Sequence, residues 1–157
     1  MALRDDISSG ESYFIVEIRS LKRILDESRK KEPLLCVIDE VLRGTNTIER
    51  IAASSQILNS LRGNWILPFA ATHDIELSYI LDEIYTNYHF EEEVREQEVV
   101  FNYLLKPGRA TTRNAIRLLD MLGYDQELVK NAGNAAADFE QTGVWAKISC
   151  NEGKGQV

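Results

Sequence analysis

The chain has 157 residues, 44% of them hydrophobic and 27% charged, which is typical of one globular domain and excludes disordered and fibrous chains. Lys and Arg total 18 against 25 Asp and Glu, so the formal net charge is −7. Duplex binding depends mainly on Lys and Arg at phosphates, so stand-alone DNA binding is not expected. Cys36 and Cys150 form neither a metal-ligand cluster nor a disulfide framework, which predicts a reducing, cytoplasmic location. No apolar run approaches the roughly 20 residues of a membrane span.

The first predicted helix follows a polar cluster at residues 8–12 and ends before Pro33, which blocks its continuation. Its apolar side chains recur at helical spacing, at Phe14, Ile18, Leu21 and Leu25. Residues 34–38 are then a continuous apolar run of strand length that ends in Asp39 and Glu40. Because this run does not alternate with polar residues, we expect a strand buried on both faces, as in the centre of a parallel sheet.

A second helix and strand follow in the same order. Residues 43–47 form a turn, and the helical spacing after it runs to Leu61. Residues 65–71 are a second candidate for a buried strand, and a short helix is expected at about residues 74–82. The order strand, helix, strand, helix predicts a parallel α/β sheet.

The pattern changes in the second half of the chain. Alternating apolar residues at 84–90 and 99–105 predict an antiparallel hairpin, with residues 91–98 as its acidic tip. Two helices are predicted next, at residues 112–122 and 125–139. The last part, residues 141–157, is expected to be a polar and partly disordered tail, so the predicted domain covers residues 1–140.

The strongest chemical signal is the apolar strand that ends in Asp39 and Glu40. Open α/β sheets place ligands at the carboxyl ends of their strands, where side chains project into a crevice. In P-loop NTPases an Asp at this position holds Mg²⁺, and a following acid orients or deprotonates the attacking water. The alternative is an acidic strand end that meets solvent or caps the next helix.

Two further segments are candidates for phosphate binding. His73 ends the next predicted strand, so it would lie near Asp39 and Glu40 if the two strands are neighbours. A neutral imidazole there would donate a hydrogen bond to a γ-phosphate or a water, whereas the alternative is a cap on the helix that begins at Asp74. Residues 8–12 would bind phosphate at a helix N-terminus, or simply cap a surface helix.

Four segments, taken in order, carry a resemblance to a known family. RDDISSGESYFIVE, VIDEVLRGTNT and ATHDIEL are similar to the signature stretch, the Walker B motif with the D-loop, and the switch-histidine segment of the MutS mismatch-repair family. LLKPGRATTRNAIRLLDMLGYDQELVKNA is similar to the final strand and closing helix pair of that family's ATPase domain. The resemblance covers most of residues 3–133, and RGTNT directly after the acidic pair is its most family-specific part.

The resemblance implies a fold and a set of site residues. The fold would be part of a P-loop NTPase of the ABC type, a three-layer α/β sheet with a β-hairpin and a C-terminal helix pair. Asp39 would be the Mg²⁺-linked acid, Glu40 the general base for water, and His73 the γ-phosphate sensor. The nucleotide-binding set would comprise signature residues that reach the nucleotide of a partner subunit and two residues that line the dimer interface, namely Ser9, Gly10 and Ser12, and Thr45 and Asn46.

The resemblance also implies cofactors and partners. ATP and Mg²⁺ would serve the intact parent domain, a second copy would complete a homodimer, and DNA would be bound through upstream regions. Tyr13 and Leu42 depart from the family, where a threonine and a glycine are common. No GxxxxGK[ST] loop occurs in the sequence, so we expect the carboxyl-terminal part of an ATPase domain that alone binds ATP weakly or not at all.

Two functional hypotheses follow. The first is a fragment of a MutS-like DNA mismatch-repair or related DNA-processing ATPase, which contributes signature, Walker B, D-loop and switch-histidine elements to Mg-ATP hydrolysis. The second is a non-enzymatic dimerisation or interaction module that retains ATPase-like motifs. The two hypotheses differ in whether the longer protein hydrolyses ATP, and the chain alone is expected to be inactive under both.

Overall fold

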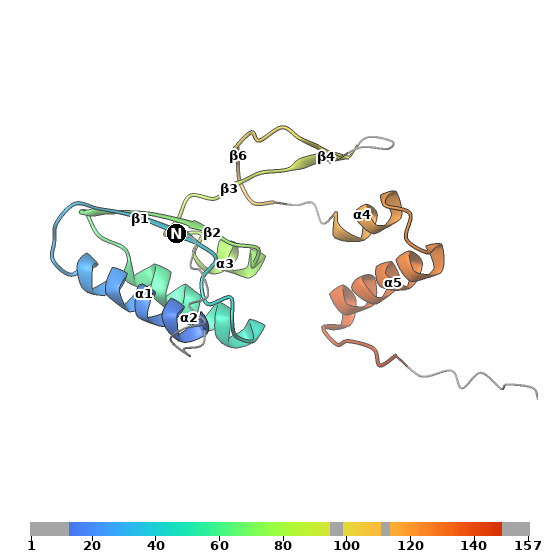
Figure 1. Ribbon diagram of the computed structural model, residues 1–157, viewed down its shortest axis with the longest axis horizontal. Helices are drawn as coiled ribbons and strands as arrows, with labels where there is room; N and C mark the ends of the chain where they lie inside the picture. Colours follow the sequence, from blue (N-terminus) through green and yellow to red (C-terminus); the bar gives the residue numbers. More distant parts are fainter. Residues whose placement is uncertain (1–12, 95–98, 111–113, 149–157) are drawn as a thin grey trace, which may run out of the picture. The chain divides into compact units, whose positions relative to one another are not determined.

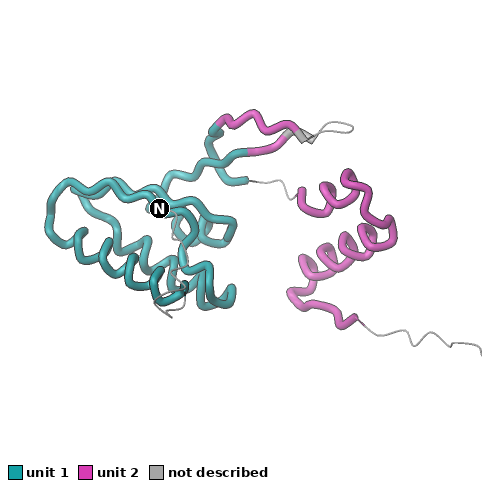
Figure 2. Tube along the Cα trace, viewed as in Figure 1, with its two compact units in different colours: residues 1–90, 105–110 teal, residues 91–104, 111–157 magenta. Residues whose placement is uncertain are grey.

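The computed structural model describes residues 13–94, 99–110 and 114–148. The chain divides into two compact units (Figures 1 and 2). Unit 1 comprises residues up to 90 together with 105–110, and unit 2 comprises residues 91–104 together with those from 111 onward. Both units combine helices with short strands, so the fold is mixed α/β.

Unit 1 begins with alternating helices and strands, in the order predicted. The elements are α1 (Tyr13–Ser28), β1 (Leu34–Asp39), α2 (Thr47–Ser60), β2 (Ile66–Ala71) and α3 (Ile75–Ile80). The two strands pair in parallel, with a register that runs from Leu34 opposite Ile66 to Asp39 opposite Ala71. The predicted parallel pairing of these strands is therefore confirmed.

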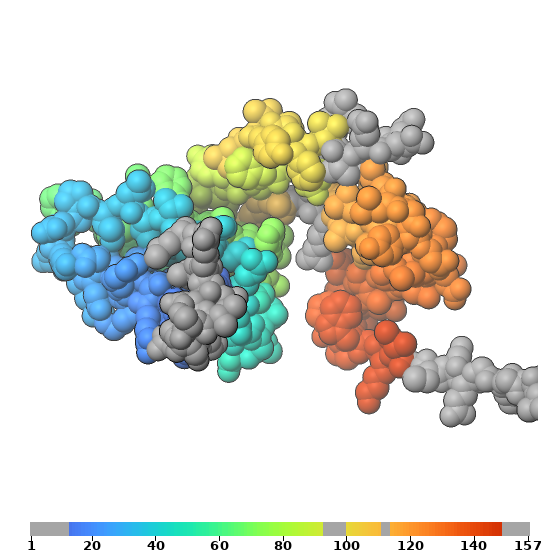
Figure 3. Space-filling model, viewed as in Figure 1, coloured from blue at the N-terminus to red at the C-terminus, as the bar shows by residue number. Residues whose placement is uncertain are grey.

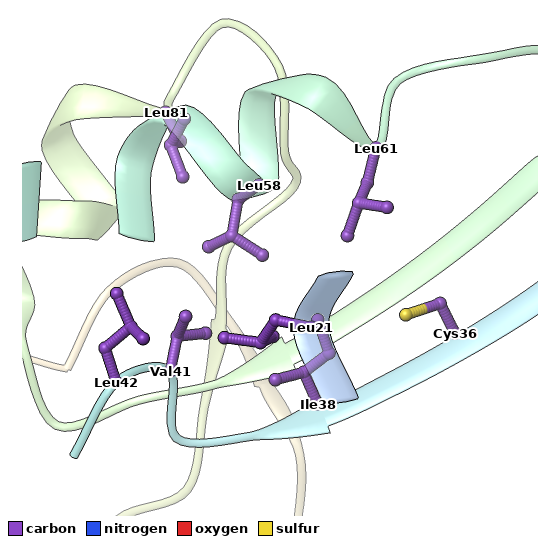
Figure 4. Packing of buried hydrophobic residues seen from close by; sticks show 8 residues of the cluster. All are labelled: Leu21, Cys36, Ile38, Val41, Leu42, Leu58, Leu61 and Leu81. Carbon is purple, nitrogen blue, oxygen red and sulfur yellow. The ribbon is translucent and has the colours of Figure 1, made fainter. Parts of the chain in front are cut away.

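The core of unit 1 lies between this sheet and the helices α1 and α2, which cover the same face of the sheet (Figure 1). Figure 4 shows the buried side chains converging from both layers; they are Leu21, Cys36, Ile38, Val41, Leu42, Leu58, Leu61 and Leu81. Burial raises the pKa of the Cys36 thiol, which keeps the thiol protonated. Cys36 thus serves as a small core residue, as the apolar run around it predicted.

The opposite face of the sheet is open, which corrects one prediction. Leu35 and Val37 on β1 are 65% and 63% exposed, and Leu67 and Phe69 pair opposite them on β2 and are also more than half exposed. The prediction that β1 is buried on both faces is wrong in this structure. Alternate residues of a strand point to opposite faces, and α1 and α2 cover only the face that carries Cys36 and Ile38.

The predicted antiparallel hairpin is present, but its strands are shorter than expected. In unit 1, β3 (Tyr88–His89) pairs with β6 (Lys106–Pro107); in unit 2, β4 (Glu92–Val94) pairs with β5 (Val99–Phe101). Residues 84–87 lie outside the strands, and residues 92–94 of the predicted tip form a strand instead; residues 95–98 lie outside the described residues. The second strand is interrupted where Tyr103 adopts a φ of 54° and the Asn102 side chain accepts the Leu104 amide, at 3.0 Å.

Unit 2 also contains the two predicted helices, α4 (Ala115–Met121) and α5 (Gln126–Thr142), which pack against each other (Figure 3). Asp125 caps α5, and Gly143, with a φ of 69°, ends it. Trp145 stacks on Phe139 with 4.1 Å between ring centroids, so α5 and its packing extend past residue 140, where the polar tail was predicted to follow. No helix within the described ranges is long and apolar enough to cross a bilayer.

Candidate functional site

The carboxyl ends of β1 and β2 bring Glu40 and His73 together. The Glu40 amide donates to the Ala71 carbonyl at 3.0 Å, which continues the ladder between the strands by one residue. The His73 amide in turn donates to Glu40 Oε1 at 3.0 Å, and His73 Nε2 lies 3.8 Å from the same oxygen. The prediction that His73 lies close to the acidic strand end if the strands are neighbours is therefore confirmed for Glu40.

The three predicted catalytic and metal-linked residues differ in their exposure. The His73 side chain is 96% exposed, whereas the Glu40 side chain is 18% exposed. Asp39 is exposed and shares the open face of the sheet with Leu35 and Val37, because it continues their alternation along β1. The imidazole and the Asp39 carboxylate are therefore free to meet a ligand from solvent, while Glu40 is held in place at one oxygen.

The backbone that follows β1 is strained at two residues. Glu40 has a φ of 60° and Leu42 a φ of 58°, in the left-handed region that residues with a Cβ atom rarely adopt. Such conformations persist only where the surroundings hold them, and they are found preferentially at functional sites. Here the side chains of Val41 and Leu42 are buried in the core, so tertiary packing stabilises this turn.

Thr45 and Asn46 stabilise the start of α2. Asn46 is its N-cap, with Oδ1 accepting the Glu49 amide at 3.0 Å, while its Nδ2 donates back to Glu49 Oε2 at 2.7 Å. Thr45 Oγ1 donates to the same carboxylate at 3.1 Å. The Glu49 carboxylate thus binds side chains on both residues that precede α2, while Asn46 caps the helix. A role of both residues at a nucleotide or a dimer interface stays a prediction. Ser9, Gly10 and Ser12 lie outside the described residues.

Arg50 fixes the segment that carries His73. Its Nε and Nη2 donate to the two carboxylate oxygens of Asp74, at 2.7 and 2.6 Å, and this hydrogen bonding raises the pKa of Arg50. Asp74 is the N-cap residue of α3, and its side chain is 10% exposed. Asp74 rather than His73 therefore occupies the cap position. The Asp74 amide also donates to Thr72 Oγ1 at 3.0 Å, which fixes the backbone on either side of His73.

Substituting Arg50 with Ala is expected to lower the free energy of unfolding by about 1–3 kcal/mol, because it leaves the Asp74 carboxylate largely buried without its cation. Urea denaturation followed by circular dichroism measures this change. Arg29→Ala is the control: its ion pair with Asp26 lies in solvent at 3.4 Å and should contribute nothing measurable. Equal stability of the Arg50 variant and the wild type would show that the pair does not anchor this segment.

No local sequence pattern predicts the roles of Arg50 and Glu17, although both contact the site segments. Arg50 resembles any polar residue on an amphipathic helix, because its partner Asp74 lies 24 residues away. Glu17 carries a weak signal: it stands three residues after Phe14 and four before Leu21, on the apolar side of its helix. A carboxylate in that position is rarely buried without hydrogen bonds to hold it.

The donor set suits a cation that arrives with phosphate. Within the described ranges, no group of three or more His, Cys, Asp or Glu side chains is placed to hold a metal ion. Mg²⁺ commonly takes only one or two carboxylates from a protein and completes its shell with phosphate oxygens and water. Asp39, exposed at the strand end, fits that requirement.

Comparison of the sequence with known proteins identifies its family. The model of MutS domain V matches residues 1–140. The chain is 33% identical to a protein of Haloarcula marismortui described as DNA mismatch repair protein MutS 2, over 90% of this chain and 15% of that protein. It is 31% identical to the DNA mismatch repair protein MutS of Chloroflexus aurantiacus, over 87% and 14%, and to that of Aquifex pyrophilus, over 87% and 16%.

The chain spans only 14–16% of the length of these relatives. The matched region nevertheless includes β1, β2 and every residue of the site described above. Because the family model covers most of the chain and these relatives exceed 30% identity across it, the chain belongs to the MutS family.

Proposed function

We propose that this chain is the carboxyl-terminal part of a MutS-like ATPase domain, and that the full-length protein hydrolyses Mg-ATP in DNA mismatch repair or a related DNA process. The observation that carries the proposal is the meeting of Glu40 and His73 at the carboxyl ends of adjacent parallel strands. Membership of the MutS family and the names of its relatives support the connection to mismatch repair.

Each residue of the site would have a separate role in hydrolysis. Asp39 would hold Mg²⁺, which when bound neutralises charge on the phosphate oxygens. Glu40 would orient the attacking water and accept its proton; Oε1 is engaged by the His73 amide, which leaves Oε2 for the water. The exposed imidazole of His73 would donate a hydrogen bond to the γ-phosphate as its charge develops.

The open face of the sheet supports the proposal that the fold is a part of a P-loop NTPase. Leu35 and Val37 form an apolar surface on that face, and Asp39 lies in line with them. A phosphate-binding loop must approach the metal-linked acid, so we infer that other parts of the full-length protein cover this face and supply the loop. The Leu67 and Phe69 side chains on β2 would be buried by the same contact.

The proposed partners follow from the family. A second copy of the domain would complete composite nucleotide sites, with Ser9, Gly10, Ser12, Thr45 and Asn46 at the interface. DNA would be bound by other regions of the full-length protein, because a net charge of −7 gives this chain little attraction for phosphate backbones.

The decisive experiment measures ATP hydrolysis by the full-length protein as Mg²⁺ is varied. The wild type is expected to hydrolyse Mg-ATP, and Asp39→Asn to need about tenfold or more Mg²⁺ for half-maximal rate, because a neutral amide oxygen binds this hard cation more weakly than a carboxylate. Glu76→Gln, which removes an exposed carboxylate in the first turn of α3, is the matched control and should leave the Mg²⁺ dependence unchanged. A folded full-length protein without hydrolysis at any Mg²⁺ concentration would favour the non-enzymatic dimerisation or interaction module.

A further inference from the structure

Glu17, on α1, is a buried carboxylate that binds the backbone of the strained turn after β1. The residue is 6% exposed, and its Oε1 accepts the amides of Leu42 at 2.6 Å and Arg43 at 3.3 Å. Among the residues that the structure describes, its Oε2 is buried without a hydrogen-bond partner, and Glu17 forms no ion pair. Two backbone amides are thus the polar groups that hold this carboxylate inside the protein.

The turn that Glu17 binds is the one that positions Glu40. Leu42, whose amide makes the shorter bond, adopts a φ of 58°, and Glu40 two residues earlier adopts a φ of 60°. A carboxylate that accepts two successive amides favours a backbone in which both N–H groups point the same way, which an extended strand does not allow. The hydrogen bonds that Glu17 accepts therefore favour the turn and oppose continuation of β1 beyond Glu40.

A second observation shows that α1 and this turn are fitted closely to each other. A Cβ atom added at Gly44 would lie 3.2 Å from the Cβ of Phe14 and 3.1 Å from its Cδ2. Phe14 lies one helical turn before Glu17 on the same side of α1. The turn is thus held against α1 by hydrogen bonds at Leu42 and Arg43 and by close packing at Gly44.

We propose that Glu17 is a positioning residue that holds Glu40 on the His73 amide, acting through the backbone of residues 41–43. The catalytic consequence rests on the proposed function, since Glu40 is the proposed general base. If the turn relaxes, the Glu40 carboxylate moves relative to the ends of β1 and β2, and a displacement of about 1 Å at a reacting group can cost about 10²-fold in rate. The geometric part of the proposal is independent of hydrolysis.

The test compares Glu17→Met with Glu17→Gln in the full-length protein. Met has nearly the volume of Glu but accepts no comparable hydrogen bond, so it leaves the Leu42 and Arg43 amides without their acceptor and opens no cavity. Gln keeps an oxygen that accepts both amides and should restore the function of Glu17. Leu21→Met is the matched control, because Leu21 lies one turn further along α1 and is equally buried, at 6% exposure.

Two measurements decide the outcome. In nucleotide-free protein, hydrogen exchange of the Leu42, Arg43 and His73 amides should be about tenfold or more faster in Glu17→Met than in wild type. In steady-state kinetics, Glu17→Met should lower kcat by about tenfold or more with KM for ATP within about threefold, because the group affected acts in the chemical step. Glu17→Gln and Leu21→Met should remain close to the wild type in both measurements.

Each other outcome overturns the positioning role. Unchanged exchange at His73 in Glu17→Met would show that the turn does not depend on Glu17, and equal losses of kcat in Glu17→Met and Leu21→Met would reduce Glu17 to a general packing role. If the wild type binds ATP without hydrolysing it, the proposed function fails, and the exchange of the His73 amide still decides whether Glu17 positions Glu40. If Glu17→Met does not fold, slower exchange in Glu17→Gln than in a Glu17→Ala variant supports the role, and equal exchange in the two overturns it.

Discussion

Glu40→Gln in the full-length protein is expected to lower kcat for ATP hydrolysis by about 10²–10⁴-fold, the usual contribution of a general base. A glutamine carbonyl can still accept the His73 amide bond that Glu40 Oε1 accepts at 3.0 Å, so the geometry of the strand ends should persist. What the substitution removes is the basicity of the second oxygen. Binding of ATP should therefore be retained while turnover is lost.

Single-turnover hydrolysis and nucleotide binding, measured on the same preparation, check this result. Glu83→Gln is a suitable control, because it makes the same chemical change at an exposed carboxylate outside the site. A normal kcat in Glu40→Gln would assign proton transfer to another group. Parallel loss of binding and turnover would instead indicate that Glu40 supports the fold of the turn between β1 and α2.

His73→Ala is expected to lower kcat by about 10²-fold, the cost of removing one donor that faces developing charge. KM for ATP should change by less than about threefold, because a γ-phosphate contact that strengthens in the transition state contributes little to ground-state binding. The side chain is 96% exposed, and its amide rather than its ring bonds Glu40, so truncation at Cβ should leave the strand ends in place.

His89→Ala is the matched control for this second substitution. His89 lies in β3, where its Nδ1 is 3.0 Å from the Gly108 carbonyl, and it has no part in the proposed site. Steady-state kinetics on both variants, with thermal unfolding measured alongside, separate catalysis from stability. If His73→Ala turns over like the wild type, His73 is a surface residue whose conformation is set by Asp74 and Thr72.

The two substitutions also separate the proposed ATPase from the interaction module. A protein whose acidic pair is only a strand end would tolerate both changes, since Glu40 makes one described side-chain hydrogen bond and His73 is almost fully exposed. Loss of turnover in both variants with retained nucleotide binding would be specific to hydrolysis.

Several features of this protein follow from the sequence alone. The apolar spacing in α1 and α2 predicts both helices, and the apolar runs at residues 34–38 and 65–71 predict the two strands, because these patterns arise from neighbouring residues. The position of Asp39 and Glu40 directly after the first run places them at a strand end, and the parallel pairing of consecutive strands then brings His73 to the same edge.

Other features depend on which elements meet. An apolar run does not state how many of its faces are covered, so the exposure of Leu35 and Val37 emerges only once α1 and α2 are seen on a single face. The alternation at 84–105 likewise predicts a hairpin but not its interruption near Tyr103. A local pattern predicts which side chains of a segment are suited to burial. Which of them are buried depends on the elements that pack against the segment in the tertiary structure.

The roles of Glu17 and Arg50 belong to this second class. Their partners lie 24–26 residues away in the sequence, on elements whose docking no local pattern specifies. The left-handed backbone of Glu40 is equally non-local, because an L-residue adopts it only when its surroundings outweigh the steric cost. The sequence alone thus determined which residues are the candidates for the chemistry, whereas the tertiary structure decided how they are held, since the energy that holds them comes from contacts between distant segments.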